Sequence, residues 1–155
     1  MDIAMPKLEW DESFSTGVPA MDEDDKRIFA YINELGDLMM GKADRNKFTK
    51  TVFSLLNFTL RHMVAEEAML IKSGYPMMDE HAEDHKRYLN EAKNLYVKYL
   101  AGDSDSRILS AELIGVFTEL LQEHIVKVDK PCGEFLARHY PEIMPHGGEG
   151  EPSWG

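Results

Sequence analysis

Three pairs of side chains in this sequence have the residue types and the spacing of metal ligands. The pairs are His62 with Glu66, His81 with His85, and His124 with Asp129. A step of four residues turns an α-helix about 40° beyond one full turn, so the first two pairs each project from one helix face. A step of five turns it about 140°, so the third pair diverges unless its aspartate enters from the last turn of the helix. Imidazole and carboxylate ligands without thiolate suit iron, manganese or zinc.

These candidate ligands lie in register with apolar residues, which indicates that they face the interior of the fold. His62 and Glu66, for example, share a helix face with Leu55 and Met63. A buried imidazole or carboxylate without a partner costs several kcal/mol, so we expect cations between these side chains. Two carboxylates that can bridge, together with four imidazoles, exceed what one tetrahedral zinc ion needs. The pattern therefore predicts two metal ions in the core of a helical bundle.

Four segments of the chain carry helical periodicity, and none shows sustained strand alternation. They span about 21–40, 46–72, 79–100 and 106–129. The intervening Gly, Pro, Asp and Ser residues end one helix and cap the next. Helices of about 20 residues span about 30 Å, so such short connections force neighbouring helices to run antiparallel. The sequence thus predicts an all-α fold, an up-down-up-down antiparallel four-helix bundle.

The two ends of the chain are expected to differ in character. Residues 1–20 contain Trp10, Phe14 and Val18, which are too apolar for a free tail, so we expect an arm packed on the bundle. Residues 21–130 form the bundle itself. In the last part, 131–155, a short helix is expected after Pro131, and the Gly- and Pro-rich residues from 141 onward are expected to be disordered.

Composition and charge narrow the class of protein. The 155 residues are 43% hydrophobic and 29% charged, which is typical of one globular domain. A net charge of −11 repels phosphate backbones and anionic lipids, so neither nucleic acid nor a membrane is an expected partner. No secretory signal or membrane segment is recognisable, so we expect a cytoplasmic protein. The lone Cys132 excludes an internal disulfide, and we assign no role to it, to His139 or to His146.

The order of these motifs resembles that of the bacterial hemerythrins over residues 8–130. The resemblance starts with Trp10, the run Phe14-Ser-Thr-Gly-Val18 and Met21-Asp22, and continues through HxxxE, Tyr-Pro, HxxxH and HxxxxD. It implies a non-heme di-iron centre with an oxo or hydroxo bridge, which binds dioxygen end-on at one iron as a hydroperoxide. Peroxide, azide and nitric oxide are further small ligands that such a centre is expected to take.

The resemblance also implies a role for each candidate ligand. By motif match, His81, His85 and His124 would bind one iron, and His62 would bind the other. Glu66 and Asp129 would bridge the two ions.

One position departs from the family pattern. The first helix of the family carries Asp-x-Gln-His-Lys, whereas this chain has Asp22-Glu23-Asp24-Asp25-Lys26. Asp25 therefore stands where the fifth histidine is expected, as a ligand of the iron with the open position. If Asp25 binds, it lowers the formal charge of the centre by about one unit, which favours the ferric state. We therefore expect easier autoxidation and a shorter-lived oxygen adduct than a five-histidine site gives.

Three functions remain open from the sequence. The first is dioxygen binding for storage, delivery or sensing. The second is a di-iron oxidase or peroxidase, because Asp25 makes the site richer in carboxylates. The third is simple iron binding or storage. We expect an apolar pocket beside the site, which suits a small neutral gas and favours the first function. Its expected lining is Ile28, Ile32, Met63, Met69 and Leu121.

Overall fold

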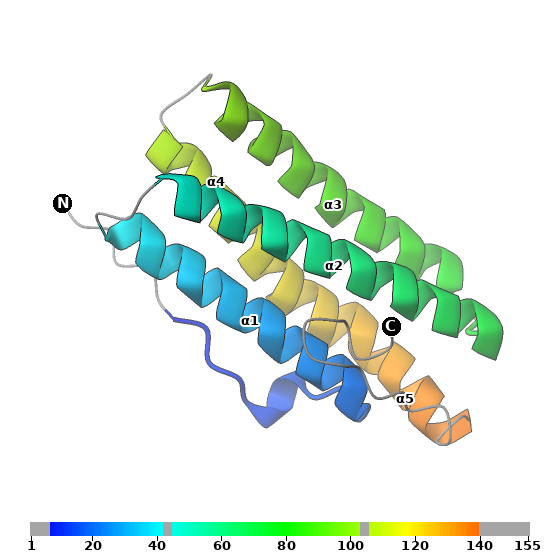
Figure 1. Ribbon diagram of the computed structural model, residues 1–155. Helices are drawn as coiled ribbons and strands as arrows, with labels where there is room; N and C mark the ends of the chain where they lie inside the picture. Colours follow the sequence, from blue (N-terminus) through cyan, green and yellow to red (C-terminus); the bar gives the residue numbers. More distant parts are fainter. Residues whose placement is uncertain (1–6, 42–44, 103–105, 140–155) are drawn as a thin grey trace.

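The computed structural model describes residues 7–41, 45–102 and 106–139 of the chain. Within these ranges the chain is helical apart from short connections. The elements are η1 (Glu12–Phe14), α1 (Pro19–Met40), α2 (Arg45–Ser73), α3 (Met78–Ala101), α4 (Ser106–Glu119), η2 (Leu120–Asp129) and α5 (Lys130–His139). Figure 1 shows the four long helices running alternately up and down, which confirms the predicted antiparallel bundle.

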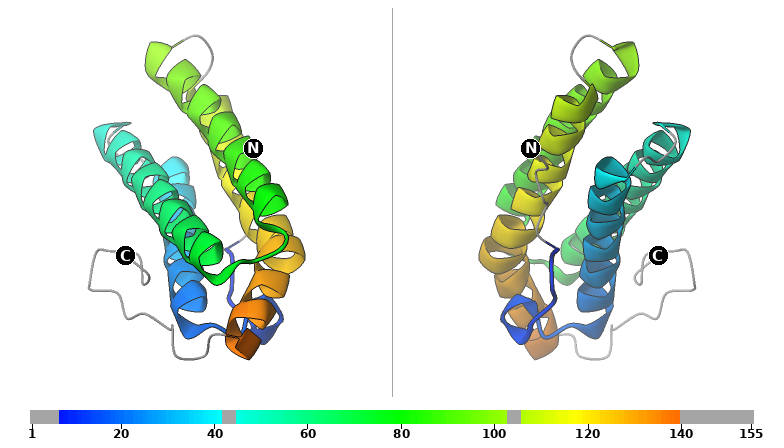
Figure 2. Two further views of the ribbon diagram at one scale, coloured as in Figure 1. Left: turned by 90° about the vertical axis from the view of Figure 1, so that its right-hand side faces the viewer. Right: turned by 90° about the vertical axis from the view of Figure 1, so that its left-hand side faces the viewer.

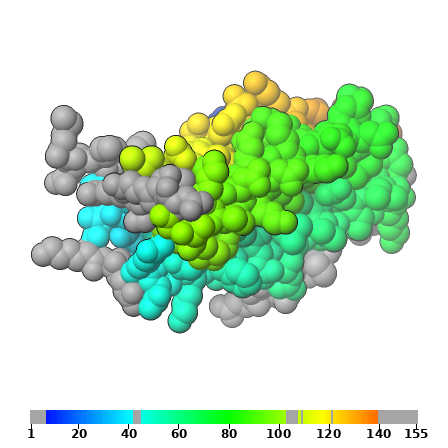
Figure 3. Space-filling view, turned by 90° about the horizontal axis from the view of Figure 1, so that it is seen from above, coloured from blue at the N-terminus to red at the C-terminus, as the bar shows by residue number. Residues whose placement is uncertain are grey.

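The helices form a closed ring of neighbours. α1 packs on α2, α2 on α3, α3 on α4, and α4 returns to α1. Figure 2 shows the α1–α2 pair and the α3–α4 pair approaching each other toward the end that carries η1 and α5. In Figure 3 the side chains of α3 cover much of one face of the bundle. The interior is therefore enclosed on all four sides by helices.

The fourth helix does not keep α-helical geometry along its length. The sequence predicts one helix over about 106–129, but its last ten residues form the π-helical segment η2. A π-helix joins residue i to residue i+5, so His124 and Asp129 lie one turn apart on the same side. The expectation that this pair diverges is therefore wrong. The chain also stays helical through Pro131 into α5, with no loop between the two segments.

The segment before α1 is attached to the bundle by both polar and apolar contacts. The backbone N–H and the hydroxyl of Thr16 both donate to Asp22 Oδ1 at 2.9 Å, and Ser15 Oγ donates to Asp22 Oδ2 at 2.7 Å. Gly17 makes the turn with a φ of +84°, which glycine adopts without strain. Trp10 and Phe14 pack against the bundle core. These contacts fix the start of α1, the helix that carries Asp24 and Asp25.

Two apolar clusters fill the bundle and enclose a polar layer. The larger cluster includes Ile28, Met63 and Tyr88, and the smaller one, toward η1 and α5, includes Met21 and Leu70. Asp25 on α1, Glu66 on α2, and His81 and His85 on α3 lie between residues of the two clusters, whereas His62 lies next to Met63 of the larger one. The polar layer is therefore shielded from water at both ends of the bundle as well as at its sides.

Some expectations fall on residues that the structure does not describe. The tail from residue 140 onward, including His146, lies outside the described residues, as do the side chains of Leu109 and Leu121. No helix in the described part of the chain combines the length and the apolar character that crossing a membrane requires.

Candidate metal centre

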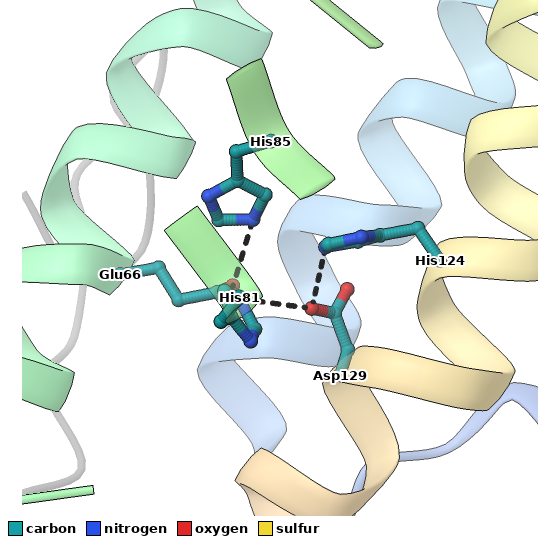
Figure 4. A group of neighbouring side chains, drawn as sticks. All are labelled: Glu66, His81, His85, His124 and Asp129. Atoms are coloured by element: carbon teal, nitrogen blue, oxygen red, sulfur yellow. Dashed lines mark hydrogen bonds and ion pairs between the residues drawn. The ribbon is translucent and has the colours of Figure 1, made fainter. Parts of the chain in front are cut away.

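Five of the predicted ligands come together at the centre of the polar layer. Glu66, His81, His85, His124 and Asp129 each offer an atom within 4.8 Å of the others. Figure 4 shows their side chains converging from α2, α3 and the end of the fourth helix. All five are buried. Three helical segments, α2, α3 and η2, thus supply a single compact group of imidazoles and carboxylates.

The carboxylates of Glu66 and Asp129 lie between the imidazoles. Glu66 Oε1 contacts His81 Nε2 and lies 3.5 Å from His85 Nε2, while Oε2 lies 3.1 Å from His62 Nε2. Asp129 Oδ1 lies 2.9 Å from His124 Nε2 and 3.5 Å from His81 Nε2. Each carboxylate therefore faces at least two imidazoles.

Three further carboxylates orient the histidine rings from behind. His62 Nδ1 donates to Asp24 Oδ2 at 2.7 Å, and His85 Nδ1 donates to Glu67 Oε2 at 3.2 Å. His124 Nδ1 donates to Asp84. A donating Nδ1 leaves Nε2 free to face the centre of the site.

Sequence reasoning missed this set of outer carboxylates. A signal for them does exist, because each is the chain neighbour of a residue in the site. Asp24 precedes Asp25, Glu67 follows Glu66, and Asp84 precedes His85. In each pair of neighbours, one side chain faces the centre of the site or a small cavity beside it. The other accepts a hydrogen bond from the Nδ1 atom of an imidazole.

His62 and Asp25 lie at the α1 side of this cluster, outside the compact group of five. Both line a small cavity of about 10 Å³, which has room for about one water-sized molecule. Asp25 is 2% exposed, and its Oδ2 makes no hydrogen bond to any described residue. The structure therefore brings Asp25 to the same cavity as His62, His124 and Asp129, without showing a direct contact between them.

Most of the surface of the cavity is apolar, as the sequence predicts, but its lining differs in part. Ile28 and Met63 line it as expected, whereas Ile32 and Met69 do not. Ile32 lies one turn deeper in the larger cluster, and Met69 packs on the far side of the polar layer. Leu120 and Ile125 line the wall in their place, together with one polar side chain that was not expected there, that of Thr59. The prediction of an apolar pocket is therefore confirmed in character, while part of its predicted lining is wrong.

The buried carboxylates of the site favour a positive charge among them. Burial, followed by the charge of Asp129, raises the pKa of Asp25 well above its usual value. Although burial opposes ionisation of Glu66, the imidazoles of three neighbouring histidines hold its pKa well below the usual range. Burial likewise disfavours the charged form of His124, but Asp129 and Asp84 raise its pKa to about 10. Protons on the histidines thus balance the carboxylates, which is the role that a metal cation would take over.

The donor set fits a metal centre. Buried atoms that face the middle of the site make no hydrogen bond of good geometry to any described residue. They include Glu66 Oε2, His124 Nε2 and Asp129 Oδ1. An unsatisfied buried polar atom is costly, and several at one place indicate a missing partner that all of them share. Nitrogen and oxygen donors without sulfur suit iron, manganese or zinc.

The fold and this site define a class, the four-helix bundles that hold metal ions with inward-facing histidines and carboxylates. The hemerythrin HHE cation binding domain matches residues 16–131, which is most of the chain and spans all of the candidate ligands. The chain belongs to this family.

Individual relatives agree with the family match. Bacteriohemerythrins of Pseudomonas aeruginosa are 26% identical over 146 residues, covering 94% of this chain and 92% of theirs. A bacteriohemerythrin of Stenotrophomonas maltophilia is 22% identical over 135 residues, covering 87% of this chain and 85% of its own. A hemerythrin-like protein of Naegleria gruberi is 28% identical over 108 residues, covering 69% of this chain and 82% of its own. Together with the buried cluster, these matches indicate a non-heme iron-binding protein.

Proposed function

We propose that this protein binds two iron ions and, through them, dioxygen or a similar small ligand. The observation that carries the proposal is the buried group of three imidazoles and two carboxylates, with His62 directly beside it. Two iron ions would supply reversible electron transfer to a bound small ligand. His81, His85 and His124 would hold one ion, and His62 and Asp25 the other. Glu66 and Asp129 would bridge them.

The chain's own residues do three things for this function. Asp24, Glu67 and Asp84 fix the orientation of the histidine rings, so that little ordering is needed when metal enters. The two apolar clusters keep water away from the site. The cavity beside Asp25 and His62 limits what can approach to a molecule of very small size.

Iron content together with an absorption spectrum tests the proposed centre. We expect two iron atoms per chain and near-ultraviolet bands of a bridged ferric pair. Glu66→Gln should lose most of the iron, because it removes a charge that faces three imidazoles. His139→Ala is the matched control, since His139 is exposed on α5 and should leave iron content unchanged. A wild-type protein that takes up one iron or none would contradict the proposal.

Dioxygen binding needs a second measurement. The reduced, iron-loaded protein should change colour on exposure to oxygen and return when the oxygen is removed under argon. A colour change that never reverses, even at the shortest mixing times, would contradict oxygen carriage.

A di-iron oxidase or peroxidase is the second candidate. Asp25 favours it, because its buried carboxylate faces the cavity and joins Glu66 and Asp129 in a site richer in carboxylates. Steady consumption of hydrogen peroxide in the presence of a reductant would support this candidate. Oxygen uptake that stops after one equivalent per iron pair would support the binding function instead.

A further inference from the structure

The hydroxyl of Thr59 differs from the other helical threonines whose hydrogen bonds the structure shows. Thr49, Thr51 and Thr118 each donate to the carbonyl oxygen four residues earlier, at 2.8–2.9 Å. Thr59 is 1% exposed, yet its Oγ1 makes no hydrogen bond to any described residue. A buried hydroxyl without a partner is destabilising, and the usual helical partner is the carbonyl of Leu55. The Thr59 side chain is thus available to a ligand.

The position of Thr59 places this hydroxyl at the candidate metal centre. Thr59 precedes His62 by three residues, so the two lie about one turn apart on the same side of α2. Both line the cavity that also contains Asp25. Thr59 Oγ1 and Asp25 Oδ2 are therefore two unpartnered polar atoms in the wall of one small cavity.

The remaining wall strengthens any hydrogen bond made there. Ile28, Met63, Leu120 and Ile125 also line the cavity. Few water molecules can compete in such surroundings, and a hydrogen bond is stronger at low polarity than in water. Met63 has a flexible side chain that can move to admit a ligand larger than one water molecule.

We propose that Thr59 determines ligand preference by donating a hydrogen bond from Oγ1 to the small ligand bound on the His62 side of the metal centre. This inference rests on the proposed function. A hydrogen bond donated by Thr59 favours ligands that have an acceptor atom, and above all anions, over ligands that have none. Asp25 lowers the positive charge of the centre and so weakens the retention of an anion, whereas a donating hydroxyl strengthens it.

Azide binding to the oxidised, iron-loaded protein tests this role. The affinity is measured by absorption titration, and the hydrogen bond by the shift of the azide infrared band between H₂O and D₂O. Thr59→Val keeps the shape but removes the donor, so it should weaken azide binding about three- to thirtyfold and abolish the shift. Thr59→Ser retains a hydroxyl and should restore the shift.

Thr51→Val provides the matched control. It makes the same substitution at a buried position of the same helix, but Thr51 Oγ1 already donates to Lys47 O at 2.9 Å. Azide affinity and the infrared shift should stay as in the wild type. An equal loss in Thr51→Val and Thr59→Val would overturn the inference, because it would reveal a general effect on the helix.

The outcomes separate this inference from the function on which it rests. If the wild type binds iron and azide but Thr59→Val changes neither affinity nor infrared shift, the role of Thr59 is wrong and the metal centre stands. If the wild type takes up no iron, or takes up iron but no azide, the proposed function fails and the role of Thr59 fails with it.

Discussion

Replacing Asp25 by asparagine should stabilise the metal-free protein and reduce the stabilisation that iron confers. Asp25 is 2% exposed, its Oδ2 has no hydrogen-bond partner among the described residues, and Asp129 and Glu66 are the nearby acids that disfavour its charge. Without a cation, this carboxylate is a cost to the fold. With iron bound, it would become one of the proposed ligands.

The expected gain in the metal-free protein follows from burial. Asparagine keeps a polar side chain but removes the ionisable carboxyl, whose charge burial and Asp129 disfavour, and we expect a gain of about 1–3 kcal/mol, the usual cost of a buried polar group without a partner. A domain near this size shifts its melting temperature by about 2–4 °C per kcal/mol. Metal-free Asp25→Asn should therefore melt about 2–12 °C above the metal-free wild type.

The expected decrease in the stabilisation by iron follows from a lower metal affinity. Removing even an outer partner of a metal ligand lowers affinity about 10- to 100-fold. At saturating iron this factor corresponds to about 1.4–2.7 kcal/mol of lost stabilisation. The stabilisation that iron confers, measured as the difference between the loaded and the metal-free protein, should thus shrink by about 1.4–2.7 kcal/mol.

Calorimetric melting of chelator-treated protein and of anaerobic protein saturated with ferrous iron measures both effects. Asp37→Asn is the matched control, since Asp37 lies on the same helix but its side chain is 66% exposed. It should leave the gain from iron unchanged. Equal gains from iron in wild type and Asp25→Asn, with no rise in metal-free stability, would refute the reasoning.

Three other features give simpler predictions. Asp84→Asn weakens the hydrogen bond that orients a site histidine, so competition with a chelator should show an iron affinity about 10- to 100-fold lower. Gly133→Ala would bring a Cβ within 2.3 Å of the Thr16 carbonyl oxygen, so urea unfolding should show an unfolding free energy lower by about 1–3 kcal/mol. Gly115→Ala is the control, because a Cβ there meets open space and should not lower the unfolding free energy. Cys132 is buried, and burial raises the pKa of its thiol, so Ellman's reagent should label it only after denaturation; rapid labelling of the native protein would contradict this packing.

The bundle could be predicted from the sequence because its signals are local. Apolar spacing marks the four helices within a few residues of their observed ends, and Gly74 and Gly102, with φ near +70°, mark two of the connections. Short connections then leave antiparallel packing as the only compact arrangement. Which histidines and carboxylates of the regular helices face inward follows from the same periodicity, which predicts that Glu66, His81, His85 and His124 lie in the interior together, as they do.

Other features were decided only by tertiary packing. No local pattern specifies the π-helical segment that brings the Asp129 carboxylate to the His124 imidazole. Its backbone hydrogen bonds depend on the contacts that its side chains make with the other helices. No local pattern specifies which carboxylate contacts each imidazole ring, or that the Thr59 hydroxyl has no hydrogen-bond partner among the described residues. Both depend on how the helices are rotated and how far apart they lie. The sequence alone determined which side chains enter the interior; the three-dimensional arrangement decided which of them meet, because side-chain contacts across the bundle join residues distant in the chain.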